Sequence, residues 1–165
     1  MENQVGDKSA EQQATQPTNP ANAAETAKEQ KPFKPIGKIL DGDVTFVTNF
    51  EGTPQQRFEF LSKVMGAGAK SLTDSLQDAI DVRTWYAHRV ELENKQTGEM
   101  NEVIRIAIVN DGGEAYTAVS DGLVNSLDML RQVFGEGPYN GEVVVKVQQV
   151  KTSNGFKTYN LVAAK

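Results

Sequence analysis

Residues 80–92 alternate between two kinds of side chain over a long stretch of the chain. Because successive side chains of a strand point to opposite faces of a sheet, this alternation predicts one long β-strand. One predicted face carries Ile80, Val82, Thr84, Tyr86, His88, Val90 and Leu92. The other predicted face carries Arg83, Trp85, Ala87, Arg89 and Glu91. We therefore expect the chain to fold around a sheet in which this strand is the longest.

The segments after this strand follow the order of a small β-barrel. Alternation over residues 102–110 predicts its hairpin partner, and residues 115–119 predict a short third strand. A helix is expected over residues 122–134, and strands over 142–150 and 156–163. Three strands, a helix and two strands is the element order of an OB-fold. The predicted fold is mainly β with inserted helices, an OB-fold-like small β-barrel.

Two helices are expected to cover this sheet. The first runs from Thr53, as N-cap, to Gly66, as the residue that stops it. Its apolar positions at helical spacing are Phe58, Leu61, Val64 and Met65, with Phe60 beside them. The second follows Ser120 as its cap, and its apolar stripe consists of Leu123, Leu127, Leu130 and Phe134, with Val124 and Val133 beside it.

The N-terminal segment has a different composition. Residues 10–30 contain only Ala, Gln, Thr, Asn, Pro, Glu and Lys. Such a segment buries too little apolar surface to offset the entropy of ordering it. We expect a disordered N-terminal tail over residues 1–36 and a domain over residues 37–165, which begins with a strand near residues 44–48. The tail is either an arm for partners or self-association, or a solubilising segment.

Composition excludes several classes of site. The chain has no Cys and one His, so it offers no disulfide, thiolate zinc site or multi-histidine metal site. We expect no metal, no cofactor and no enzymatic activity. The net charge of −5 argues against clamping of duplex DNA but leaves room for a local basic groove. No apolar run reaches the roughly 20 residues of a membrane helix, and a cytoplasmic protein without membrane contact is expected.

The predicted outward face of the long strand combines guanidinium groups with an indole. Arg83, Trp85 and Arg89 share that face, and Arg105 on the paired strand has the matching parity. An aromatic ring stacks on any base and a guanidinium pairs with phosphate, so this combination suits single-stranded nucleic acid. Other basic and aromatic side chains gather near the later strands. The residues expected to bind DNA on this basis are Arg83, Trp85, Arg89, Arg105, Lys146, Phe156 and Lys157.

Each of these residues also has a structural alternative. Trp85 instead packs under the first helix, where Phe58 and Leu61 need a partner. The arginines pair with the abundant carboxylates, and Phe156 only packs against its own hairpin. The sequence leaves these alternatives open.

The run from Glu102 to Ser120, EVIRIAIVNDGGEAYTAVS, resembles single-stranded DNA-binding proteins of small phages with protein-primed linear genomes. In those proteins a strand leads to Asp-Gly, then an aromatic residue, then a hydrophobic-Ser step into a helix. The last hairpin, with its Gly-Phe turn, is similar to theirs. The resemblance covers residues 80–165 and implies an OB-fold that binds single-stranded DNA, with Tyr116 as a DNA-contacting aromatic. The N-terminal tail and the first helix depart from the family's smallest members.

From these observations we expect a sequence-independent single-stranded DNA-binding protein that coats and protects displaced strands during phage DNA replication, in the host cytoplasm. Its expected partners are single-stranded DNA and a second copy of the chain through the N-terminal region. The alternative is a non-enzymatic structural or interaction protein with a β-domain and a disordered arm. The first hypothesis predicts an accessible Trp85, and the alternative predicts a buried one.

Overall fold

The predicted long strand is β3 (Ile80–Glu93), which organises the sheet in the computed structural model; the structure describes residues 31–164. β3 pairs with β4 (Met100–Asn110) along most of its length. Its other edge pairs with β6 (Val144–Lys151) at the start of the strand and with β1 (Phe46–Thr48) further along. The remaining elements are α2 (Ile36–Leu40), α3 (Pro54–Met65), β2 (Lys70–Ser71), a 3-10 turn (Leu72–Asp74), β5 (Ala115–Val119), α4 (Asp121–Phe134) and β7 (Lys157–Ala163).

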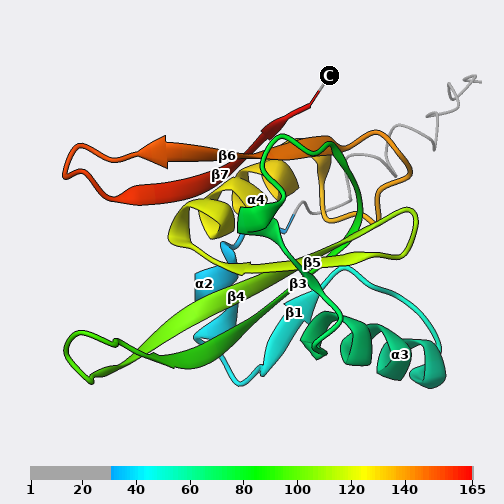
Figure 1. Cartoon of the computed structure of the whole chain (residues 1–165). Helices are drawn as coiled ribbons and strands as arrows, with labels where there is room; N and C mark the ends of the chain where they lie inside the picture. Colours follow the sequence, from blue (N-terminus) through cyan, green and yellow to red (C-terminus); the bar gives the residue numbers. More distant parts are fainter. Residues whose placement is uncertain (1–30, 165) are drawn as a thin grey trace, which may run out of the picture. The chain divides into compact units, whose positions relative to one another are not determined.

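The strand order is β2-β5-β4-β3-β6-β7, with β1 beside β3 (Figure 1). The sheet curls into a half-barrel, and α4 packs against β7 at its open side (Figure 1). The segment of residues 70–76 lies between β5 and β6, because β2 pairs in parallel with β5 and Leu76 bridges in parallel to Val147. This architecture confirms the predicted mainly β, OB-like fold and its order of three strands, a helix and two strands.

The sheet carries an apolar cluster on each face. The cluster inside the curl is the larger one, and α4 contributes Leu123, Leu127 and Leu130 to it, as the sequence predicts. The predictions of Phe134 in that stripe and of Val133 beside it are wrong, since these side chains are 50% and 70% exposed. The second cluster lies under α3 and consists of Phe60, Val64, Tyr86, Ala107 and Val109, with Ala115. Each fully buried large apolar side chain contributes roughly 1.5–3 kcal/mol to stability.

The first predicted helix has the expected ends and part of the predicted buried face. Thr53 and Gln56 form a reciprocal capping box, and Pro54 occupies the first turn. The helix ends before Gly66, where a Cβ atom would collide with the carbonyl oxygen of Ser62. Phe60 and Val64 are buried, whereas Phe58 is 70% exposed. Of the predicted apolar positions, Val64 is confirmed and Leu61 packs partly buried against the cluster, whereas Phe58 and Met65 are wrong, because β4 and β5 contact the side of α3 that carries Phe60 and Val64.

The compact unit reaches back to Phe33, ahead of the predicted start at residue 37. Ile36 is fully buried, and its backbone N–H donates to both carboxylate oxygens of Asp128 in α4, at 3.0 and 3.2 Å. The predicted disorder of the tail falls mainly on residues 1–30, which lie outside the described residues. Among the helices of residues 31–164, none combines the length and the apolar character that a membrane crossing requires.

Candidate nucleic-acid interface

A bulge in β3 changes which side chains face the core. Val82 pairs with Asn110 and Thr84 with Val109, so Arg83 is the extra residue between them. The inserted residue reverses the alternation that the sequence shows, and Trp85 and Ala87 join Ile80 and Val82 inside the curl. The predicted outward position of Trp85 is therefore wrong.

Trp85 is held in the core by polar and cationic contacts. Its side chain is 2% exposed, and its Nε1–H donates to the carbonyl oxygen of Glu136 at 3.2 Å. The guanidinium of Arg131 lies 4.8 Å from the centre of the indole. In this conformation the ring offers no free face to a base.

The two arginines of β3 are paired with carboxylates, as the structural alternative expects. Arg83 is exposed and lies 3.3 Å from Asp111. Arg89 bonds to Asp41 and Glu102 and to the carbonyl oxygen of Gly37. Both guanidiniums are thus largely neutralised, which weakens their use as phosphate contacts.

Arg105 lies on the opposite face of the sheet from Trp85. It pairs in register with His88, whereas Trp85 pairs with Ile108, so the predicted common face is wrong. Within residues 31–164 Arg105 makes no ion pair within 4 Å. Burial, followed by the charge of Arg105, lowers the pKa of His88, whose Nδ1 has no hydrogen-bond partner.

Tyr116, the aromatic that the resemblance implies, is largely covered. It is 8% exposed, and its hydroxyl donates to Glu114 at 3.1 Å. The ammonium group of Lys70 lies 5.6 Å from the ring centre and 2.6 Å from the same carboxylate. Burial and the Glu114 carboxylate raise the pKa of the Tyr116 phenol. A contact of Tyr116 with DNA stays a prediction.

The last hairpin gathers the remaining predicted residues. Lys157 pairs across the hairpin with Lys151, on the face that also carries Val147 and Leu161. Lys146 pairs with Val162 on the opposite face. Phe156, beside the Gly155 turn, is 73% exposed. Lys157 and Phe156 are thus close together at the tip, and Lys146 lies nearer the barrel.

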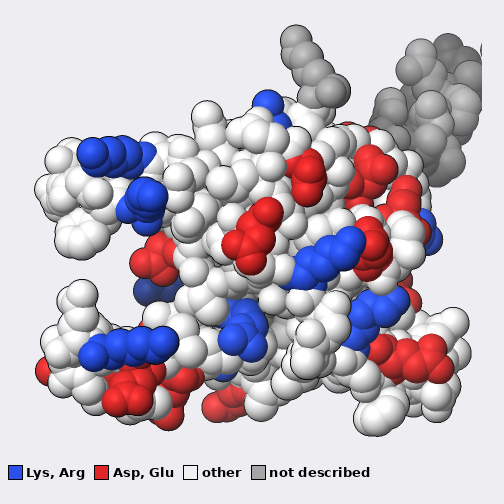
Figure 2. Space-filling model, viewed as in Figure 1, with Lys and Arg blue, Asp and Glu red and all other residues white. Residues whose placement is uncertain are grey.

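This hairpin is a long basic stretch without carboxylates. Residues 143–164 hold three lysines, Lys146, Lys151 and Lys157, and no Asp or Glu. The hairpin projects beyond α4, and Figure 2 shows basic but no acidic side chains on the end of it that faces the viewer. We call this part, residues 144–163, the basic arm. The absence of carboxylates was visible in the sequence, and counting acids and bases separately along the chain would have identified it.

The β3–β4 hairpin projects on the same side as the basic arm, and an open space separates the two in Figure 2. Its outer part has the opposite charge balance, with Glu91, Glu93, Glu99 and Glu102 against Lys95. A polyanion is therefore attracted to one projecting hairpin and repelled by the other. The basic arm is the candidate nucleic-acid interface.

Comparison with known proteins agrees with this geometry. A family model described as "Phage Single-stranded DNA-binding protein" matches residues 61–163. The matched segment contains β2 to β7 and α4, and thus the whole basic arm. No curated protein and no solved structure gives a match. Because the match covers more than half of the chain, the protein belongs to the family of phage single-stranded DNA-binding proteins.

Proposed function

We propose that the protein coats single-stranded DNA displaced during phage DNA replication, without sequence preference, and that the basic arm is its principal contact. The observation that carries the proposal is the arm itself, which has three lysines, an exposed phenylalanine and no carboxylate. Lysines neutralise phosphates of any sequence, and an aromatic ring stacks on any base. Nothing in this surface has the fixed donor and acceptor pattern that base-specific readout requires.

The buried Trp85 matches what the alternative, a structural or interaction protein, expects. It does not separate the two functions, because the basic arm supplies a nucleic-acid contact that does not need the indole. Because the indole is buried, quenching of Trp85 fluorescence is a poor measure of DNA binding. Fluorescence polarisation of a labelled oligonucleotide reports binding regardless of where the tryptophan lies.

The test is a polarisation titration of the full chain with labelled single-stranded oligonucleotides at low salt. We expect similar Kd values for oligonucleotides of different sequence, weaker binding to duplex DNA, and loss of affinity as salt rises. The double substitution Lys151→Glu and Lys157→Glu should weaken binding strongly. Lys95→Glu is the matched control for each of the two single substitutions, because it changes the charge equally and Lys95 is an exposed lysine in the turn of the other projecting hairpin.

Two outcomes would contradict the proposal. Absence of binding at low salt would remove single-stranded DNA as a partner. Equal weakening by Lys95→Glu and by the single substitution Lys157→Glu, which changes the charge by the same amount, would show that net charge, and not the basic arm, determines the affinity. Self-association through the N-terminal region is part of the proposed function, and sedimentation of the full chain with and without residues 1–30 measures it.

A further inference from the structure

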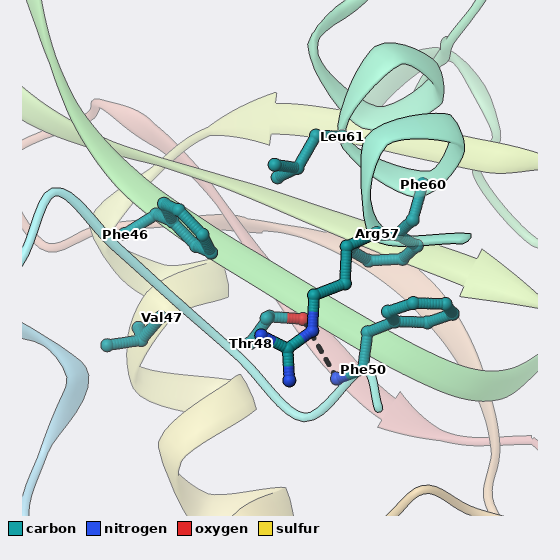
Figure 3. A pocket seen from close by; sticks show the side chains of 7 residues that line it. All are labelled: Phe46, Val47, Thr48, Phe50, Arg57, Phe60 and Leu61. Atoms are coloured by element: carbon teal, nitrogen blue, oxygen red, sulfur yellow. Dashed lines mark hydrogen bonds between the residues drawn. The ribbon is translucent and has the colours of Figure 1, made fainter. Parts of the chain in front are cut away.

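A pocket of about 360 Å³ lies between β1 and α3, on the side of the sheet away from α4 (Figure 3). Its lining residues are Phe46, Val47, Thr48, Phe50, Arg57, Phe60 and Leu61. Three of these are aromatic and one is cationic. The volume is within the range of small-molecule sites in proteins, roughly 300–1,000 Å³. Sequence analysis did not single out any of these residues as a site.

The walls of this pocket, the β1–α3 pocket, are aromatic and well supported. The rings of Phe50 and Phe60 are stacked, with centroids 4.4 Å apart and an angle of 7° between their planes. Phe60 meets Tyr86 of β3 edge to face at 6.4 Å. Phe46 packs against the same tyrosine at 5.4 Å and keeps 37% of its surface exposed. Phe46 therefore keeps part of its ring accessible at the opening, whereas Phe60, at 7% exposed, supports the wall from behind.

Arg57 supplies the charge of the pocket. Its side chain extends from α3 between Phe46 on one side and Phe50 on the other in Figure 3. Within residues 31–164 it makes no ion pair within 4 Å, unlike Arg83, Arg89 and Arg131. An unpaired guanidinium beside apolar rings suits a ligand that joins a flat ring to an anionic group.

We propose that the β1–α3 pocket holds one nucleobase of the bound single strand, with a neighbouring phosphate at Arg57. A nucleotide of DNA has both parts that the pocket recognises, a planar ring and a negative charge. The proposal rests on the proposed single-stranded DNA binding and adds a second contact to it. The family match begins at residue 61, so β1 and residues 54–60 of α3 lie outside the segment that the family accounts for.

The direct test is photocrosslinking of the full chain to a single-stranded oligonucleotide that carries 5-iododeoxyuridine, followed by trypsin and mass spectrometry. Trypsin cleaves after Lys38 and Arg57, so residues 39–57 form one peptide with Phe46 and Phe50. Residues 152–157 form another, with Phe156. We expect crosslinks on both peptides. Crosslinks on residues 152–157 alone overturn the pocket proposal and leave the proposed function intact, whereas absence of any binding overturns the function itself.

Substitutions give an independent measure. Phe46→Ala should raise the Kd for an oligothymidine about 5-fold or more, since stacking contributes on the order of 1–3 kcal/mol per base. The effect should vanish on an oligonucleotide made of abasic sites, where the double substitution of Lys151 and Lys157 should still weaken binding. Phe58→Ala is the matched control, because Phe58 lies on α3, beside the pocket, is 70% exposed and does not line the pocket.

Phe46→Leu distinguishes the loss of stacking from a folding defect, because it keeps an apolar side chain and removes only the aromatic ring. It should reproduce the loss of affinity with an unchanged unfolding midpoint. The proposal is overturned if Phe46→Ala loses the same affinity for abasic oligonucleotides as for normal ones. The proposal is also overturned if a second copy of the chain fills the pocket. In that case the chain would form a dimer that Phe46→Ala dissociates, and residues 39–57 would show no crosslinks.

Discussion

The guanidinium of Arg131 lies 4.8 Å from the indole of Trp85 and 5.1 Å from the ring of Phe33. The same side chain bonds to Asp128 at 2.7 Å and to both oxygens of Glu136 at 2.7 and 3.0 Å. One buried arginine thus joins the segment before α2, the helix α4 and the long strand β3. This cation serves the fold, and it is not available to phosphate.

Arg131→Leu should therefore be strongly destabilising. Its side chain is 2% exposed, and its removal leaves the largely buried carboxylate of Asp128 without a cation. Loss of one partner of a buried pair costs about 3–5 kcal/mol, and the value here should fall at the lower end because Glu136 is exposed. Urea denaturation measures the change. Arg83→Gln breaks an exposed pair with Asp111 and should cost less than about 1 kcal/mol. An equal loss of unfolding free energy in the Arg131→Leu and Arg83→Gln variants would contradict the structural role of Arg131.

Gly122→Ala should displace the basic arm from α4. A Cβ atom at Gly122 would collide with the backbone carbonyl of Tyr159 and lie 2.5 Å from the side-chain oxygen of Asn160, both in β7. Overpacking of this kind costs about 1–3 kcal/mol. Gly68→Ala is the control, because nothing lies within 4 Å of its Cβ position. Thermal unfolding of both variants checks the prediction, which fails if they unfold at the same temperature.

Phe156→Ala should weaken single-stranded DNA binding without loss of stability. The ring is 73% exposed, so its removal leaves no cavity, and any effect comes from contacts with the ligand. If Phe156 stacks on one base, its removal should cost on the order of 1–3 kcal/mol of binding free energy. Polarisation titrations measure this cost as a higher Kd. An unchanged Kd would mean that the tip of the basic arm does not touch the bases. Phe58→Ala again serves as the exposed aromatic control.

His88 should make stability fall as the pH drops below its ordinary pKa. Burial, and then the charge of Arg105, lowers the pKa of His88 below 6.5 in the folded chain. The unfolded chain consequently binds a proton first, and stability is lost as the pH falls from 6.5 toward the folded pKa. Unfolding midpoints on both sides of pH 6.5 measure this loss. His88→Phe should reduce the change of stability with pH in that window. An unchanged slope of stability against pH would show that other groups cause the loss.

Local patterns determined much of the fold from the sequence. The capping pattern at Thr53 set the start of α3, because a cap depends on residues within one turn. The alternation over residues 102–110 correctly predicted the hairpin partner of β3, because successive residues of one strand carry that pattern. The acid-free stretch of residues 143–164 was likewise present in the sequence, as was the resemblance that the family match confirms.

The tertiary structure decided which polar and aromatic residues are available. The bulge at Arg83 depends on the register between β3 and β4, and it moved Trp85 from the predicted surface into the core. The carboxylates that neutralise Arg89 are Asp41, directly after α2, and Glu102 of β4, which only folding brings to β3. The sequence by itself determined the element order and the charge of each segment. Pairing between distant strands determined which side chains face solvent, since a single inserted residue reverses every face that follows it.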